Sequence, residues 1–243
     1  MRKLEERADG KHAVAKKPFE PLGTFKEQSI EKALRFAYDM TFGESGEHRS
    51  TRSGGTHRRK NGEKFADTFQ GKLAEFAIYN QLYKTHNINE PDLGVWGRGE
   101  WDDVDFIIDG KKTAVKSTKA IGDLLLLETK DWTMKGEYIP NIEKDGGLYD
   151  CFILVRLEPF PASIIKSAKL YYANEASYET LSGLLKTQNW KYDIPGFITR
   201  DELIEAMRQG NIIYQGEKLN GSTRMDAENY YVQSGDMHPI NEI

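Results

Sequence analysis

Charged side chains alternate with apolar ones in the stretch DDVDFIIDGKKTAVKS, which begins at residue 102. Within it, Asp109-Gly110 is a typical two-residue turn between antiparallel strands, so the stretch predicts a hairpin. Asp105 then begins the first strand, and Ala114 and Lys116 lie near the end of the second. Residues two apart point to the same face of a strand. A carboxylate and an ammonium group are therefore predicted to converge at one end of a sheet.

This combination of groups suits the hydrolysis of a phosphodiester, in which the phosphate is anionic and the leaving group is poor. A hard divalent cation held by carboxylates polarises the phosphate and activates a water molecule. A lysine beside it stabilises the developing charge. Such a site normally has a second carboxylate two residues before the lysine, and here Ala114 occupies that position.

The apolar periodicity predicts the elements that would position these residues. We expect helices over residues 25–42, from Asp67 or Thr68 to about 83, over 178–185 and over 200–209. We expect strands over residues 104–108, 113–117, 124–129 and 150–157, with short strands at 212–214 and 230–232. Residues 163–170 fit a strand or a short helix. This order predicts an α/β or α+β fold with one central mixed sheet flanked by helices.

A chain of 243 residues suits one large domain. We expect a loose N-terminal arm over residues 1–24 and a single domain over residues 25–243. The catalytic core would cover about 65–160, and a basic loop would cover about 44–64. Residues 161–243 would supply further α/β elements for recognition or dimerisation.

The bulk composition favours a cytoplasmic protein. The chain has no apolar run long enough to cross a bilayer, and its charged first residues do not resemble a secretory signal. Its one cysteine, Cys151, cannot form an intramolecular disulfide, which fits a reducing compartment. The formal net charge of −4 argues weakly against nucleic acid, although an acidic protein can still carry a basic groove.

Residues 48–64 form such a basic segment, with six basic side chains against Glu63 alone and a net charge of +5. The segment leads directly into the helix that contains Glu75. It is either a solvated linker or a loop that contacts phosphates and base edges in DNA. The candidate DNA contacts, which include two residues at the end of the hairpin, are Arg49, Arg52, His57, Arg58, Arg59, Lys60, Ser117 and Lys119.

The hairpin and the preceding helix resemble the PD-(D/E)XK nuclease superfamily, which has the fold of most type II restriction endonucleases. In that family an Asp begins one strand, an acid-x-Lys triplet closes the next, and a Glu often projects from a preceding helix. Asp105, Lys116 and Glu75 match these positions, whereas Ala114 stands where the family has its second acid. The match is specific for residues 69–119. It implies a restriction-endonuclease-like core.

The resemblance implies a site in which Asp105, the acid missing at Ala114 and the Val115 carbonyl hold Mg²⁺, which Mn²⁺ could replace. Glu75 would hold or orient a second metal ion or a water. Lys116 would assist the attacking water. Three explanations of Ala114 stay open. It is an engineered replacement of the acid, or the acid comes from elsewhere, such as Glu75 or Asp103, or the chain is a natural pseudonuclease. We favour the first, because the rest of the motif is intact.

The function implied is a sequence-specific, Mg²⁺-dependent endonuclease for double-stranded DNA, of the type II restriction kind and impaired by Ala114. Cleavage of both strands at a palindrome needs two active sites, so a homodimer is expected. The resemblance alone adds a cognate DNA methyltransferase as a partner in a restriction–modification pair. Two alternatives stay open. One is a repair, recombination or phage-defence nuclease of the same fold, and the other is a non-catalytic DNA-binding protein.

Overall fold

The main sheet of the computed structural model has five strands in the order β3-β8-β7-β5-β4. The structure describes residues 1–6, 12–43, 59–94, 104–145, 147–219 and 223–243. Strands β5 and β7 are parallel, and all other neighbours in this sheet are antiparallel. The mixed sheet expected from the sequence is therefore confirmed. Its strands are β3 (Gly23–Thr24), β4 (Phe106–Ile108), β5 (Lys111–Lys119), β7 (Cys151–Glu158) and β8 (Lys191–Thr199).

A second sheet of three strands has the order β6-β12-β9. The stretch from Leu124, which could be a strand or a buried helix by pattern alone, is strand β6 of this sheet. Two short antiparallel pairs, β1 with β2 and β10 with β11, complete the strands. The bounds of these strands are β1 (Glu5–Glu6), β2 (His12–Ala13), β6 (Leu124–Glu128), β9 (Ile212–Ile213), β10 (Lys218–Leu219), β11 (Thr223–Arg224) and β12 (Asn229–Gln233).

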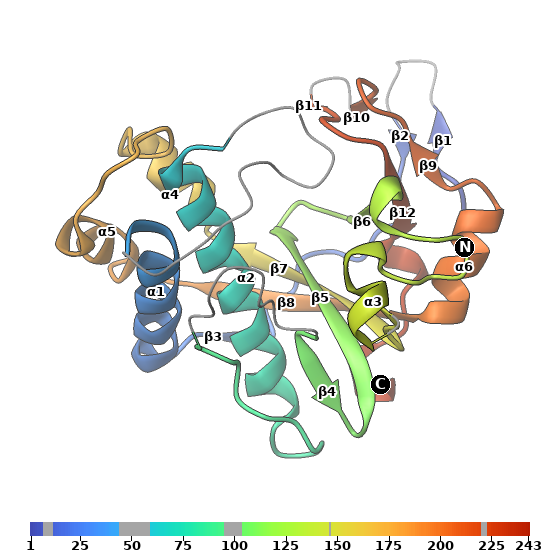
Figure 1. Cartoon of the computed structure of the whole chain (residues 1–243), viewed down its shortest axis with the longest axis horizontal. Coiled ribbons are helices and arrows are strands. Elements are labelled where there is room, and N and C mark those ends of the chain that lie inside the picture. Colours follow the sequence, from blue (N-terminus) through green and yellow to red (C-terminus); the bar gives the residue numbers. More distant parts are fainter. Residues whose placement is uncertain (7–11, 44–58, 95–103, 146, 220–222) are drawn as a thin grey trace.

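Helices cover both faces of the main sheet (Figure 1). Helix α2 packs on one face, with α1 against its outer side, and the second sheet and α6 lie on the other face. Among the described residues, none of the helices has the length and apolar character needed to cross a bilayer. The helices are α1 (Glu27–Phe42), α2 (Asn61–Leu82), α3 (Ile142–Asp145), α4 (Pro161–Ser167), α5 (Tyr178–Leu185) and α6 (Arg200–Arg208), with 3₁₀ turns at Thr129–Asp131, Ile139–Asn141, Ser234–Asp236 and Ile240–Glu242.

Helix α2 begins at Asn61, six residues before the start expected at Asp67. The Gly62 N–H donates to the Ala173 carbonyl at 2.9 Å, and the Asn61 side-chain amide donates to the Asn174 carbonyl at 2.9 Å. These partners lie more than a hundred residues away, so no local capping pattern announces this helix start. Part of the basic segment, expected as a loop to residue 64, is therefore helical.

Strand β8 contains Pro195 and Gly196, and residues 191–199 were not expected to form a strand. Proline cannot donate to a strand ladder, so it is usually confined to edges and bulges. Here the ladder between β7 and β8 is irregular between Leu154 and Arg156, and Pro195 has no register partner. The irregularity lets the strand continue past the proline. Residues 161–167 form helix α4, which selects the helical alternative for that segment.

The described part of the first 24 residues, expected as a loose arm, makes contacts with distant parts of the chain. Arg2 forms an ion pair with Asp236, and the Ala15 N–H donates to Gln233 Oε1 at 2.6 Å. The Lys17 ammonium donates to two main-chain carbonyls at 2.7 and 2.8 Å. All these partners lie in the C-terminal third of the chain, so their positions cannot be inferred from the polar composition of the segment.

Candidate functional site

The β4–β5 hairpin is built as the sequence predicts, with its turn at Asp109-Gly110. Both residues have positive φ, 48° and 84°, as a tight two-residue turn between antiparallel strands requires. The Asp109 carboxylate lies 2.7 Å from His86 Nδ1 and accepts the Asn87 N–H at 2.8 Å. The hydrogen bond with His86, and then that with Asn87, lower the pKa of Asp109. These contacts hold the turn, and Phe106 pairs with Thr113.

Asp105 contacts β5 immediately beyond the last paired residues of the hairpin. Its Oδ2 accepts the Val115 N–H at 2.6 Å, and the side chain is half-buried. Strand β4 pairs with β5 only as far as Thr113. The carboxylate therefore replaces a strand partner along this edge of β5. The predicted approach of Asp105 to the end of the second strand is present.

Ala114 and Lys116 lie on one face of β5, as their spacing predicts. They pair in parallel register with Phe152 and Leu154 of β7, which belong to the apolar cluster beneath the second sheet. Ala114 is itself part of that cluster and is 2% exposed. Lys116 is half-buried, and within the described ranges its ammonium has no recorded hydrogen-bond or ion-pair partner.

Val115 and Ser117 point to the opposite face of β5, which α2 covers. Val115 packs against the cluster that includes the apolar side of α2. Ser117 Oγ accepts a hydrogen bond from Gln70 Nε2 at 3.0 Å. Gln70, which sequence reasoning missed, is a polar residue of α2 with only 9% of its surface exposed. The sequence signal that could have found Gln70 is a polar residue among the apolar residues that α2 buries.

Glu75 lies on α2, on the other side of the sheet from Ala114 and Lys116. Its Oε2 accepts a hydrogen bond from the Lys72 ammonium at 2.6 Å. Lys72 is also buried, donates to the Asp92 carbonyl at 2.7 Å and lies over the ring of Phe36 in α1. Asp105 therefore has a hydrogen bond to β5, whereas Glu75 has one to Lys72 of its own helix.

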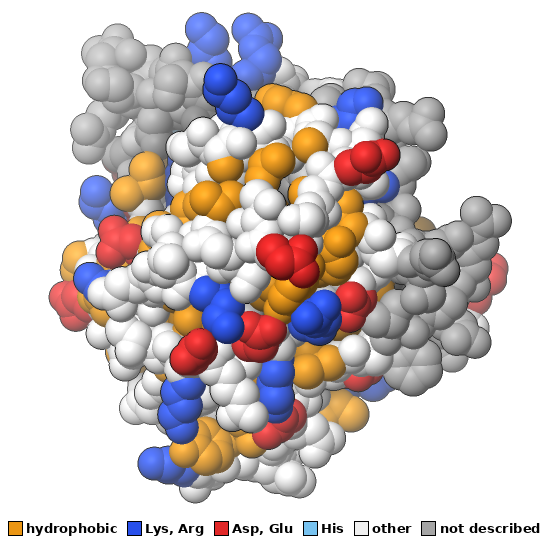
Figure 2. All heavy atoms as spheres, turned by 90° about the vertical axis from the view of Figure 1, so that its left-hand side faces the viewer, with side chains coloured by type: hydrophobic (Ala, Val, Ile, Leu, Met, Phe, Trp, Pro, Cys, Tyr) orange, Lys and Arg blue, Asp and Glu red, His pale blue; other side chains and the backbone are white. Residues whose placement is uncertain are grey.

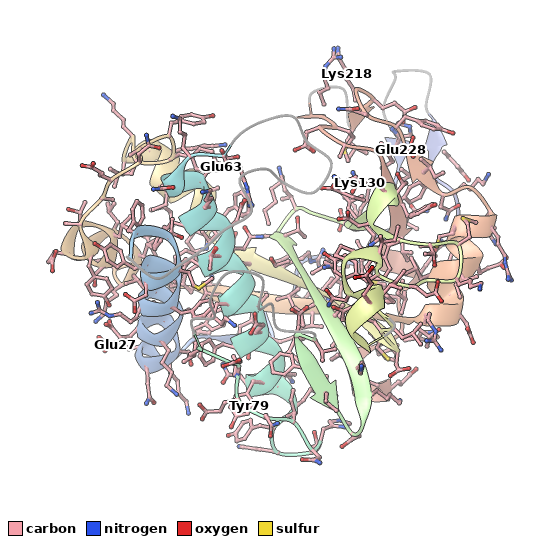
Figure 3. All side chains as sticks on the ribbon, viewed as in Figure 1. Glu27, Glu63, Tyr79, Lys130, Lys218 and Glu228 are labelled. Carbon is pink, nitrogen blue, oxygen red and sulfur yellow. The ribbon has the colours of Figure 1, made fainter. Side chains whose placement is uncertain are left out.

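The predicted DNA contacts divide into described and undescribed residues. Arg49, Arg52, His57 and Arg58 lie outside the described residues. Arg59 forms an ion pair with Asp67 at 3.1 Å, and Lys60 is exposed where α2 begins. Lys119 is exposed at the end of β5, which passes between α2 and the second sheet. In Figure 3, Glu63 near the start of α2 and Lys130 after β6 lie on either side of this strand end.

Charge is arranged differently on the face beside α1. Figure 2 shows acidic and basic side chains interspersed over most of that face, with basic side chains gathered only at its upper end. Lys186, the residue that follows α5, forms an ion pair with Glu31 of α1 at 2.8 Å. Alternating charges of this kind do not favour a polyanion.

The described donors fit a hard cation only in part. Asp105 supplies one carboxylate, and the Val115 carbonyl points to the same edge of β5 as its N–H, as the geometry of a strand requires. No group of three or more His, Cys, Asp or Glu residues that could hold a metal is present among the described residues. Asp102 and Asp103 lie outside those residues. Mg²⁺ can be held by one or two carboxylates while it keeps several waters.

A cavity of about 380 Å³ lies at the opposite end of β5, away from Lys116. Its lining includes Lys111, Cys151, Thr199 and His238. His238 Nε2 lies 2.7 Å from Glu202, which also caps α6. Burial raises the pKa of the Cys151 thiol, so this cysteine is a weak nucleophile. The arrangement of these groups does not form a nucleophile–base pair.

No family model, curated protein or solved structure matches this chain.

Proposed function

We propose that this chain is a Mg²⁺-dependent DNA endonuclease of the PD-(D/E)XK type, with Ala114 leaving its site one carboxylate short. The observation that carries the proposal is the contact between the Asp105 carboxylate and the N–H of Val115, the residue before Lys116. The parallel pairing of β5 with β7 and the position of α2 on the sheet also support it. The finer assignment, to a homodimeric type II restriction enzyme, rests on the sequence resemblance.

Each described residue has a chemical role in this proposal. Asp105 and the Val115 carbonyl would provide the oxygen ligands for the cation. Bound there, the cation would polarise the scissile phosphate and lower the pKa of a water molecule. The Lys116 ammonium, which has no recorded competing partner within the described ranges, would be available to stabilise negative charge on the attacked phosphate. Glu75 would contribute only if it left Lys72.

We expect Ala114→Glu or Ala114→Asp to produce Mg²⁺-dependent cleavage of supercoiled plasmid. Adding Asp105→Asn or Lys116→Ala to the active variant should reduce the cleavage rate by at least about 100-fold, as removal of one charge-stabilising group commonly does. Asp201→Asn and Lys135→Ala are matched controls, because both residues are exposed and neither belongs to the hairpin. Gel analysis of nicked and linear products gives the rate.

Folding must be checked in the same experiment, because a carboxylate at position 114 enters an apolar cluster. If both folded variants stay inert with Mg²⁺ and Mn²⁺, the nuclease proposal fails. Cleavage by the unaltered chain that Asp105→Asn abolishes would support the proposed reaction and place the second acid elsewhere. Discrete fragments would support a restriction enzyme, and nicking of branched substrates would support a repair enzyme.

A non-catalytic DNA-binding protein is the second candidate, and the burial of Ala114 among apolar side chains favours it. Under either proposal the chain binds duplex DNA with strong salt dependence. We expect Lys60→Ala and Lys119→Ala each to reduce the slope of log affinity against log salt by about 1, the effect of one lost phosphate contact. Lys186→Ala, on the mixed-charge face, should leave the slope unchanged.

Fluorescence anisotropy with a labelled duplex between low and moderate salt measures this slope. Absence of binding at low salt, where phosphate contacts are strongest, would contradict both candidate functions. A slope that falls equally for Lys186→Ala would show that the contact is not localised at the end of β5.

A further inference from the structure

The end of β5 is held from two sides around Lys116. On its open edge, Asp105 accepts the N–H of Val115 at 2.6 Å. On the face covered by α2, Gln70 donates to Ser117 Oγ at 3.0 Å. Lys116 lies between these two anchored residues, and its own ammonium has no recorded partner in the described part of the chain. The position of the backbone from which its side chain projects therefore depends on how its neighbours are held.

The remaining neighbour of this segment is the irregular part of the sheet. Lys116 pairs with Leu154 of β7, and the register between β7 and β8 shifts between Leu154 and Arg156. Bulges of this kind bend a strand and increase its twist. Strand β4 ends before this point, so it gives no support. A hydrogen bond from α2 is thus well placed to fix the strand here.

A glutamine at position 70 destabilises the protein unless its buried side-chain amide forms a hydrogen bond. Its side chain is 9% exposed, and Phe69 and Leu73 beside it are fully buried. A buried amide without a hydrogen-bond partner destabilises the fold, whereas an alanine at this position would cost no desolvation. We propose that Gln70 is a positioning residue that, through Ser117, fixes the direction of the Lys116 side chain. The structural part of this inference stands by itself, and only its effect on cleavage rests on the proposed function.

The test uses the full chain with its lysines reductively ¹³C-dimethylated, and Lys116→Arg identifies the signal of Lys116. We expect Gln70→Ala and Ser117→Ala to shift and broaden this signal, and the double variant to do no more than either single change. Gln81→Ala, an exposed glutamine of the same helix, is the matched control and should leave the signal unchanged. An unmoved Lys116 signal in folded Gln70→Ala protein would reduce Gln70 to a packing role and overturn the proposal.

A second readout applies if Ala114→Glu cleaves DNA. Gln70→Ala in that background should slow single-turnover cleavage about fivefold, the effect of losing one neutral hydrogen bond, with DNA affinity changed less than about twofold. A parallel loss of affinity and rate would contradict positioning. If no variant cleaves DNA, the nuclease proposal fails, and the Lys116 signal still decides the role of Gln70.

Discussion

Arg156→Ala is expected to lower the free energy of unfolding by about 3–5 kcal/mol, because it leaves buried carboxylates without their counter-charge. Arg156 is 1% exposed. Its Nε and Nη2 bind both carboxylate oxygens of Asp193, and its Nη1 lies 3.0 Å from Asp123. The remaining N–H groups donate to the Lys17 and Pro18 carbonyls at 2.9 and 2.8 Å. All five guanidinium donors are thus used.

This network ties the N-terminal segment to the centre of the main sheet. Its loss should therefore release residues 12–18 as well as destabilise β7 and β8. Urea unfolding measures the effect, and hydrogen exchange at Lys17 locates it. Arg208→Ala removes an exposed arginine in the last turn of α6 and should change stability by less than about 0.5 kcal/mol.

Replacing both Arg156 and Asp193 separates the attraction between their charges from the free-energy cost of burying each charge. We expect Arg156→Met with Asp193→Leu to be less destabilising than Arg156→Ala. The double variant no longer leaves the more buried carboxylate, that of Asp193, without its partner, and Asp123 loses its partner in both variants. An unfolding free energy of Arg156→Ala within about 1 kcal/mol of the Arg208→Ala value would show that water reaches the carboxylates readily, and the network would lose its assigned role.

Local patterns predicted those elements whose cause is local. The apolar stripe of residues 25–42 gives α1, and the Asp109-Gly110 pair gives the hairpin turn with the register that brings Asp105 to β5. The spacing of Ala114 and Lys116 correctly placed both on one face. In each case the determining residues lie within a few positions of the structure they determine.

Long-range contacts determine what the sequence did not predict. Strand β8 depends on a neighbouring strand that accommodates Pro195. The N-terminal segment depends on the guanidinium donors of Arg156 and on the carbonyl acceptor of Met237. The motif at Glu75 fixes its residue type but not the direction of its side chain, which the rotation of α2 sets. The burial of Ala114 depends on the second sheet, in which β6 pairs with β12, a strand about a hundred residues further along the chain.

Two glycines of α2, Gly62 and Gly71, have different surroundings, so the same substitution is expected to have opposite effects at the two positions. A Cβ on Gly62 would lie 1.9 Å from the Leu170 carbonyl oxygen and 2.8 Å from that of Tyr171. Both obstacles are main-chain atoms, which cannot move aside as a flexible side chain can. We expect Gly62→Ala to destabilise the protein by about 3 kcal/mol, the upper range for overpacking.

Gly71→Ala is the matched change, because a Cβ there meets nothing within 4 Å. Alanine is favoured over glycine within a helix by about 0.8–1 kcal/mol, so this variant should gain nearly that much stability. The two identical substitutions should therefore differ by roughly 4 kcal/mol in urea unfolding. Equal effects would contradict the close packing of α2 on the 170–173 segment. Since that contact sets where α2 begins, Gly62→Ala should also weaken the Gln70–Ser117 hydrogen bond, and the Lys116 signal would report this.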